Sequence, residues 1–336
     1  MIVKPIILFL TLASILFFSV HVSGDSLQSF DAQMQFTNET ISPSENDNYF
    51  DLQLEPKQKT VLHISITNLK DRPITIIPSF NRATTNQLGV IEYSGKNQDT
   101  IENLPADIEK VVTLNQESFT LTGHEQKTIE LTVNMPEKAF EGMIAGGLYL
   151  QEKPTAETKG NIQHVFSREI AVVLKNKLPP LKPALTLKKA APIQINQRNA
   201  ITATLQNTNA AYLTNGELHY EIKKNNQSAP LLTGTEPIAF SPNSGMDYLI
   251  FLKGKKFQPG TYHLSAKIKN EAIDWQQQTT FVISKETSNS YNEKDVSLTQ
   301  ENTSSFNWLL WTAGGIILAL IVVIAYLLYS MKKNKQ

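Results

Sequence analysis

A run of polar side chains at Arg82, Thr84, Thr85 and Asn86 has the residue types needed to hold a ligand rich in hydroxyl, amide and carboxylate groups. Hydroxyl and amide side chains donate and accept hydrogen bonds, and a guanidinium pairs well with carboxylates. Tyr93 follows soon after and offers a ring that can stack on the face of a sugar. The alternative is an ordinary turn whose Thr and Asn side chains bond their own backbone. The sequence leaves both interpretations open.

A second candidate ligand surface is the segment 142–147, where Gly142, Gly146 and Gly147 flank small apolar residues. Glycine in a strand lets a ligand or another backbone approach closely. We favour the simpler interpretation, a glycine-bent strand packed against its neighbour across the sandwich. The segment is not a phosphate-binding loop, because no Gly-Lys-Ser/Thr follows it.

Signatures of catalysis and metal binding are absent from the sequence. The chain has no cysteine, which excludes thiol chemistry, thiolate metal sites and disulfides. None of the histidines has another histidine at metal-ligand spacing. No Gly-x-Ser-x-Gly or His-Glu-x-x-His motif occurs. We therefore expect a non-enzymatic protein without a cofactor or a metal. The 31 basic and 31 acidic residues include no basic run with interleaved aromatics, so we expect no nucleic-acid partner.

The elements that must position these side chains are β-strands. Apolar and polar residues alternate in several segments, for example at Leu62, Ile64 and Ile66. A period of two places one face in a core and the other in water. The prolines of 178–183 interrupt this pattern and predict a stiff linker. The sequence therefore predicts an all-β fold of two immunoglobulin-like β-sandwich domains, an N-terminal one over 25–177 and a second over 184–284.

The two ends of the chain predict export and anchoring. Residues 1–24 resemble a signal peptide, and 285–307 reads as a disordered stalk because it is polar and rich in Ser and Asn. The segment 308–331 has no charged residue and is long enough for a C-terminal transmembrane helix. Lysines in the tail 332–336 favour a cytoplasmic C-terminus. We expect a single-pass membrane protein whose N-terminal part lies outside the cell.

Several strings, taken in order, resemble a known family. In the first predicted domain they are Asn48-Tyr49-Phe50-Asp51-Leu52, Arg82-Ala83-Thr84-Thr85-Asn86, Ile91-Glu92-Tyr93, Met135-Pro136 and Phe140-Glu141-Gly142-Met143-Ile144-Ala145-Gly146-Gly147. In the second they are Ser241-Pro242-Asn243-Ser244, Pro259-Gly260-Thr261-Tyr262 and Trp275 before Phe281-Val282-Ile283. With the expected signal peptide and span, the chain resembles the WxL-interacting protein family of Gram-positive bacteria. The resemblance covers nearly the whole chain.

The resemblance implies a first domain that binds peptidoglycan and a second domain that binds host or extracellular matrix proteins. It also implies partnership with secreted WxL-domain surface proteins. One departure is visible at Glu55-Pro56-Lys57, where a Pro-Gly turn is expected. Lysine takes a positive φ less easily than glycine, so we expect a turn of another type here.

Two functions are compatible with these observations. The first is a cell-surface binding scaffold that attaches to the cell wall and binds partner proteins, with strand addition at a sandwich edge as a physical route. The alternative is a membrane-tethered assembly chaperone for secreted surface proteins. A wall-glycan enzyme is a third hypothesis, but no motif supports it.

Overall fold

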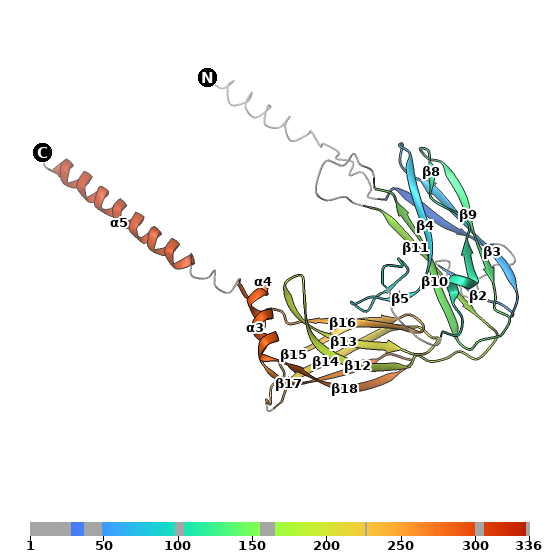
Figure 1. The fold of residues 1–336 in the computed structure, drawn as a ribbon. Coiled ribbons are helices and arrows are strands. Elements are labelled where there is room, and N and C mark those ends of the chain that lie inside the picture. The colour runs from blue at the N-terminus through green and yellow to red at the C-terminus, as the bar shows by residue number, and fades with distance from the viewer. Residues whose placement is uncertain are drawn as a thin grey trace, which may run out of the picture.

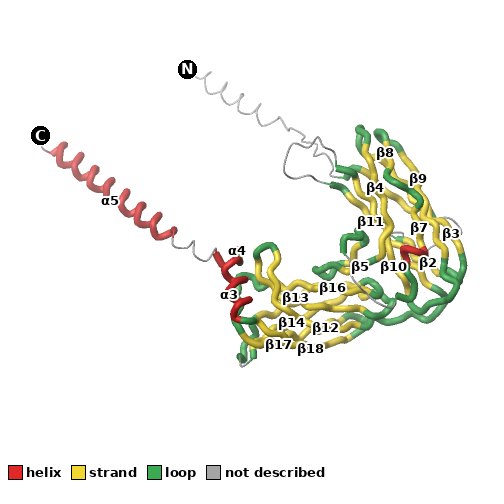
Figure 2. The backbone as a smooth tube through the Cα atoms, viewed as in Figure 1, coloured by secondary structure: helices red, strands yellow, loops and turns green. Residues whose placement is uncertain are grey.

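The computed structural model describes residues 28–36, 49–97, 104–154, 165–225, 227–299 and 306–333. Strands dominate these residues and form two β-sandwiches that meet at an angle, with a long helix leading away from the second one (Figure 1). Figure 2 shows the same arrangement, with the strands in yellow and the few helices in red. The expected signal peptide, 1–24, lies outside the described residues.

The first sandwich consists of a four-stranded and a five-stranded sheet. The four-stranded sheet has the order β1 (Phe30–Gln35), β3 (Lys59–Asn68), β9 (Gln126–Asn134) and β7 (Val112–Leu114). The five-stranded sheet has the order β2 (Phe50–Gln53), β11 (Ser167–Lys175), β10 (Met143–Glu152), β4 (Ile74–Arg82) and β8 (Phe119–Leu121). All neighbours are antiparallel except β2 and β11. A single helical turn, α2 (Ile108–Val111), packs near β4.

The core of the first sandwich lies between its two sheets, as the period of two predicts. Leu62, Ile64 and Ile66 of β3 are fully buried, and so are Leu131 and Val133 of β9. Alternate residues of each strand point to the same face, so these side chains share one side of the sheet. Their burial removes apolar surface from water, which is the main stabilising contribution here.

The second sandwich has a three-stranded sheet of β12 (Leu185–Ile195), β13 (Arg198–Asn207) and β16 (Ser244–Phe251). Its four-stranded sheet has the order β15 (Leu232–Phe240), β14 (Leu213–Lys224), β17 (Gly260–Lys269) and β18 (Asp274–Ile283). The buried Tyr262 hydroxyl donates a hydrogen bond to the Gln258 carbonyl oxygen at 2.8 Å. Such a tyrosine corner is common in immunoglobulin-like sandwiches. Trp275 packs partly buried against this core.

A short two-stranded sheet, β5 (Thr84–Thr85) and β6 (Ile91–Glu92), projects from the end of β4. It lies against β15 and β16 of the second sandwich. In Figure 1 this hairpin occupies the inner side of the bend between the two sandwiches. We refer to residues 83–93 as the docking hairpin.

The C-terminal part of the chain differs from the disordered stalk expected over 285–307. Residues up to 299 form two helices, α3 (Lys285–Lys294) and α4 (Val296–Thr299). The side chain of Asn292 ties α3 to the second sandwich, because it accepts a hydrogen bond from Phe257 N and donates one to Phe257 O, at 2.8 Å each. Composition gave no sign of these contacts, because polar residues make them. Residues 300–305 lie outside the described part.

The transmembrane part of the expected fold class is wrong. Residues Phe306–Lys333 form the helix α5. Within the described ranges, however, no helix combines the length and the apolar character needed to cross a membrane. The expected span at 308–331, and the single-pass membrane location that depended on it, are therefore not supported.

The turn at Glu55-Pro56-Lys57 also differs from expectation. Lys57 adopts a positive φ of 64°, the value that glycine would have taken there. Gln58 N donates to Glu55 O at 3.1 Å and closes the turn. Lys57 N donates to Pro136 O at 3.0 Å, and this bond between loops holds the strained residue in place.

Candidate functional site

The two sandwiches are joined by buried hydrogen bonds around Thr85 of the docking hairpin. Thr85 Oγ1 lies 2.7 Å from Ser244 Oγ and accepts a hydrogen bond from Ser241 N at 3.0 Å. Ser241 Oγ donates to Ala83 O at 3.2 Å. All four residues are fully buried. Because buried polar groups are costly when unpaired, these bonds fix how the hairpin sits on the second sandwich.

The tip of the docking hairpin pairs with the backbone of both sheets of the second sandwich. Leu249 N of β16 donates to Gln87 O at 3.0 Å, and Ala239 N of β15 donates to Gly89 O at 2.8 Å. Asn86 shapes the tip, because its side-chain oxygen accepts bonds from Leu88 N and Val90 N. The hairpin therefore spans the open side between two edge strands.

Gly142 makes a second contact between the sandwiches. Its φ is +73°, and a Cβ atom there would lie 2.2 Å from the Ala210 carbonyl oxygen. The next residue, Met143, donates its N–H to that same carbonyl at 2.8 Å. Only glycine allows the two backbones to approach this closely.

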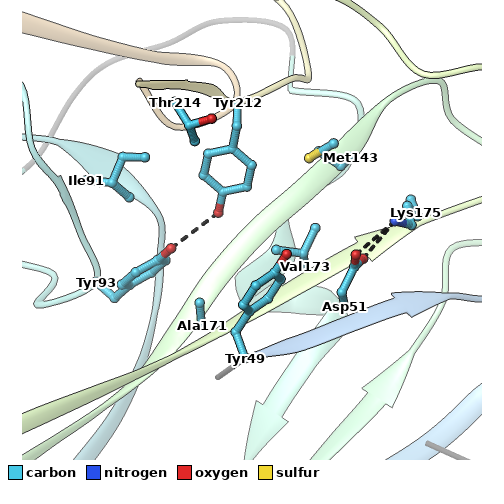
Figure 3. A pocket seen from close by; sticks show the side chains of 10 residues that line it. All are labelled: Tyr49, Asp51, Ile91, Tyr93, Met143, Ala171, Val173, Lys175, Tyr212 and Thr214. Carbon is cyan, nitrogen blue, oxygen red and sulfur yellow. Dashed lines mark hydrogen bonds and ion pairs between the residues drawn. The ribbon is translucent and has the colours of Figure 1, made fainter. Parts of the chain in front are cut away.

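Between these contacts lies a cavity of about 370 Å³, which we call the junction cavity. Figure 3 shows that side chains of both sandwiches face it. Its lining is mostly apolar and aromatic, and consists of Tyr49, Asp51, Ile91, Tyr93, Met143, Ala171, Val173, Lys175, Tyr212 and Thr214. A mainly apolar pocket of this size with a few polar groups is typical of a ligand site.

Strand geometry places one wall of the junction cavity. Ala171, Val173 and Lys175 are alternate residues of β11 and therefore point to the same face. The edge strand β2 runs parallel to β11 with Asp51 opposite Val173. Tyr49 directly precedes β2. This wall belongs wholly to the first sandwich.

The opposite wall is built by Tyr93 of the docking hairpin and Tyr212 of the second sandwich, whose hydroxyl groups lie 3.3 Å apart. Burial raises the pKa of the Tyr93 hydroxyl, although the bond to Tyr212 works against this rise. Burial, together with the neighbouring Tyr93, raises the pKa of Tyr212 well above its ordinary value. Both phenols therefore stay neutral near pH 7 and can donate or accept hydrogen bonds.

The charged end of the junction cavity is the ion pair of Lys175 Nζ and Asp51 Oδ1, 2.8 Å apart. Asp51 is 8% exposed, so its carboxylate depends on Lys175 for compensation. The lysine side chain is 30% exposed and can reach a ligand without leaving the pair. The cavity thus combines three aromatic rings, neutral hydroxyl groups and one ion pair, which suits binding of a sugar or a short peptide.

Among the residues proposed from the sequence, Tyr93 lines the junction cavity. Gly147 lies directly beneath it, where a Cβ atom would come within 2.6 Å of the Tyr93 ring. Gly146 is tight against Asn81 O and Phe80 instead. The glycine segment is therefore close-packed against β4, the docking hairpin and the second sandwich. It contributes to the cavity by making room for Tyr93.

The other polar residues proposed from the sequence lie in the contact between the sandwiches. Thr84 and Thr85 are buried, and Asn86 bonds its own loop. Arg82 donates from its guanidinium to Asn243 O at 3.3 Å. The structure does not bring these side chains to the junction cavity.

Sequence reasoning missed Tyr49, Asp51, Lys175 and Tyr212 as cavity residues. Tyr49 and Asp51 stand in a string that supported the family resemblance, but nothing there marked them as ligand-facing. Lys175 and Tyr212 carry no local signal. Only the pairing of β2 with β11, and the docking of one sandwich on the other, bring the four side chains together.

Two sandwiches locked together around an aromatic cavity define a two-domain β-sandwich binding protein. Residues 30–152 match the family model of the WxL Interacting Protein peptidoglycan binding domain. Residues 157–293 match that of the WxL Interacting Protein host binding domain. The chain therefore belongs to the WxL Interacting Protein family, as the sequence strings predicted, and is a binding protein of the cell surface.

The two matched segments do not coincide with the two sandwiches. The second match begins at 157, yet β11 pairs with β10 and β2 of the first sandwich. The last strand of the first sandwich therefore lies in the segment matched to the host binding domain. The junction cavity draws residues from both matched segments.

Solved structures with a similar fold are distant. The class 5 fimbriae chaperone CfaA is 11% identical at a TM-score of 0.30, with 75% of this chain and 98% of that chain covered. The PapD-like domain 7 of human CEP192 is 12% identical at a TM-score of 0.27, over 44% of this chain and 84% of that one. The E. coli chaperone DraB is 10% identical at a TM-score of 0.26, over 66% and 88%. No curated protein matches.

Proposed function

We propose that this cell-surface protein attaches to peptidoglycan through the junction cavity and holds a protein partner on its second sandwich. The junction cavity carries this proposal. Half of its lining residues belong to the segment matched to a peptidoglycan binding domain, and two of these, Tyr49 and Tyr93, can face a sugar ring or a peptide stem. Amphipathic rings pack on the apolar face of a sugar while hydroxyl groups bond its edge.

The Asp51–Lys175 pair supports the same ligand class. Peptidoglycan presents carboxylates and amides as well as hydroxyl groups, and a partly exposed lysine is suited to a carboxylate. Tyr212 of the second sandwich completes the cavity. Wall binding therefore depends on both sandwiches in this proposal.

For the second sandwich we propose WxL-domain surface proteins as the partners, with a host extracellular matrix protein as a further partner. The family names support a host-binding role for this segment. The chaperone alternative gains nothing from the likeness to chaperone structures, because TM-scores of 0.25 to 0.30 carry no functional argument.

The test is sedimentation of the full chain with purified insoluble peptidoglycan. Tyr49→Ala and Tyr93→Ala should each raise the Kd for peptidoglycan about tenfold, since each removes one aromatic wall. Tyr326→Ala is the matched control, because Tyr326 is exposed on α5 and far along the chain from the cavity. Unchanged sedimentation of both cavity variants would show that the wall ligand binds elsewhere.

A further inference from the structure

The open side of the second sandwich is closed only in part by the docking hairpin. Its walls, β15 and β16, are edge strands of different sheets. Beside the hairpin tip a second cavity of about 270 Å³ remains, which we call the edge groove. Its lining includes Leu88, Tyr220, Glu236, Tyr248, Phe251 and Lys253.

The backbone along this opening is able to pair with another strand, because the docking hairpin already does so. Ala239 N of β15 donates outward to Gly89 O. Successive N–H groups of a strand point to alternate sides, so those of Thr235 and Thr233 point the same way as that of Ala239. Pro237 between them has no N–H but keeps its carbonyl. The unpaired edge of β15 therefore continues beyond the hairpin.

The surface beside this edge is apolar. Leu88 and Val90 of the hairpin tip are 60% and 55% exposed. The aromatic wall comes from Tyr248 and from Tyr220, whose ring packs where a Cβ atom of Gly234 would stand, only 2.2 Å away. Adjacent exposed apolar side chains next to an aromatic opening are typical of an interaction surface.

Charge does not favour a strongly acidic or basic occupant. Glu236 and Lys253 supply one charge of each sign to the lining. Burial, followed by the nearby Glu236, raises the pKa of Tyr248 to about 12, so its hydroxyl stays neutral. An uncharged, extended segment fits this environment best.

We propose that the edge groove binds an extended apolar segment of a partner protein, which adds as a strand to β15 beside the docking hairpin. One apolar side chain of that segment would pack against Leu88 and Tyr248. Main-chain pairing would supply affinity and the aromatic pocket would supply selectivity. This inference rests on the proposed partner-binding role of the second sandwich and assigns that role a surface. The occupant follows from continuity with the hairpin, which already pairs with both edges.

The experiment uses the full chain and a fluorescein-labelled peptide of sequence Lys-Thr-Val-Thr-Val-Thr-Val-Thr-Lys, followed by fluorescence anisotropy. The expected result is saturable binding. An analogue N-methylated at alternate residues keeps its side chains but loses the hydrogen bonds along one edge. It should bind about tenfold more weakly, which is the cost of one or two lost backbone bonds.

Two variants of the chain test the groove from both of its walls. Leu88→Asp places a charge in the apolar wall, and Thr235→Pro removes an outward N–H from β15 while leaving the inward ladder intact. Each should weaken peptide binding about tenfold. Val282→Asp is the matched control, because Val282 is 64% exposed on β18 at another edge. Melting curves show whether each variant is folded. If one groove variant does not fold, the other is enough to test the groove.

The inference would be overturned if the peptide did not bind the wild-type chain. It would also be overturned if the peptide bound both groove variants as tightly as the wild-type chain. Self-association that Leu88→Asp abolishes would also overturn it, because the occupant would then be a second copy of this chain. Sedimentation with peptidoglycan separates the two proposals. A chain that binds the wall but not the peptide contradicts the edge groove alone, whereas a chain that binds the peptide but not the wall contradicts wall attachment alone.

Discussion

The two sandwiches share one structural feature, a buried asparagine at the end of a long strand, and differ in how they contact each other. Each ends a long strand with a fully buried asparagine, Asn68 as the last residue of β3 and Asn207 as the last residue of β13. The Asn68 side-chain amide donates to Thr122 O at 2.8 Å and to Arg72 O at 2.9 Å. The Asn207 amide donates to Ala211 O at 2.7 Å and to Ser241 O at 3.1 Å. Both asparagine side chains thus donate hydrogen bonds to backbone carbonyl groups of turns, which have no partner in a neighbouring strand.

The two sandwiches differ in the part that each plays in the contact between them. The first extends the docking hairpin outward, whereas the second receives it between β15 and β16. Both candidate binding sites, the junction cavity and the edge groove, include residues of this hairpin. Strands thus build the two cores, whereas the docking hairpin contributes to both candidate sites.

The largest effect is expected when the two buried asparagines are replaced and the variants Asn207→Ala and Asn68→Ala are compared. Each removes the partner of several buried backbone groups, so each should lower the free energy of unfolding by about 3 kcal/mol. Asn207 also bonds Ser241, which contacts the docking hairpin. Asn207→Ala should therefore speed amide exchange of the hairpin residues, whereas Asn68→Ala should not. Urea unfolding and hydrogen exchange measure both effects. Equal exchange in the two variants would show that the turn and the hairpin are uncoupled.

Gly142→Ala tests the close approach of the two sandwiches. The new Cβ atom would clash with the Ala210 carbonyl and strain a positive φ, for a combined cost of about 2.5 kcal/mol. Gly254→Ala is the control, because Gly254 also has a positive φ, +82°, but no atom lies within 4 Å of its Cβ position. The control should lose only about 1 kcal/mol in thermal unfolding. Similar losses would mean that backbone strain alone matters at Gly142.

The C-terminal helices should loosen in acid because of Asp295, which is 2% exposed. Burial raises its pKa, but hydrogen bonds from Ser297 and from Asn199 N outweigh burial and hold the pKa below the ordinary 3.8. A carboxylate with a lowered pKa stabilises the fold above its unfolded pKa, and this contribution is lost as pH falls through the folded value. Proteolysis of the segment 285–299 should therefore accelerate below about pH 4. In Asp295→Asn the acid-dependent part of this acceleration should shrink, and an unchanged pH profile would assign the effect to other carboxylates.

The smallest effect is expected at Lys57. Lys57→Gly relieves a positive φ but gains flexibility in the unfolded chain, so the net stabilisation should be about 0.5 kcal/mol. Lys57→Ala removes the exposed ion pair with Glu137 and keeps the strain, so it separates the two contributions. Denaturant midpoints resolve the difference. A destabilising glycine would mean that the strain at this turn is negligible.

Much of the fold follows from local sequence pattern. The period of two at Leu62, Ile64 and Ile66 identified a strand with one buried face, and the strings around Tyr93 and Gly142 identified the family.

The site could not be predicted in the same way, because it depends on contacts between distant segments. Tyr49, Lys175 and Tyr212 meet only once β2 has paired with β11 and the sandwiches have docked. The helix α3 was mistaken for a stalk because several of its contacts with Phe257 come from polar side chains such as Asn292. The transmembrane expectation rested chiefly on the length of 308–331 and its lack of charged residues, and the described helices do not support it.

The most direct test of a wall site built by both sandwiches is Tyr212→Ala in peptidoglycan sedimentation. Tyr212 lies outside the segment matched to a peptidoglycan binding domain, yet it lines the junction cavity opposite Tyr49. We predict that Tyr212→Ala weakens wall binding about tenfold, as much as Tyr93→Ala does. Wall binding equal to that of the wild-type chain would contradict a site at the junction and return wall attachment to the first sandwich alone.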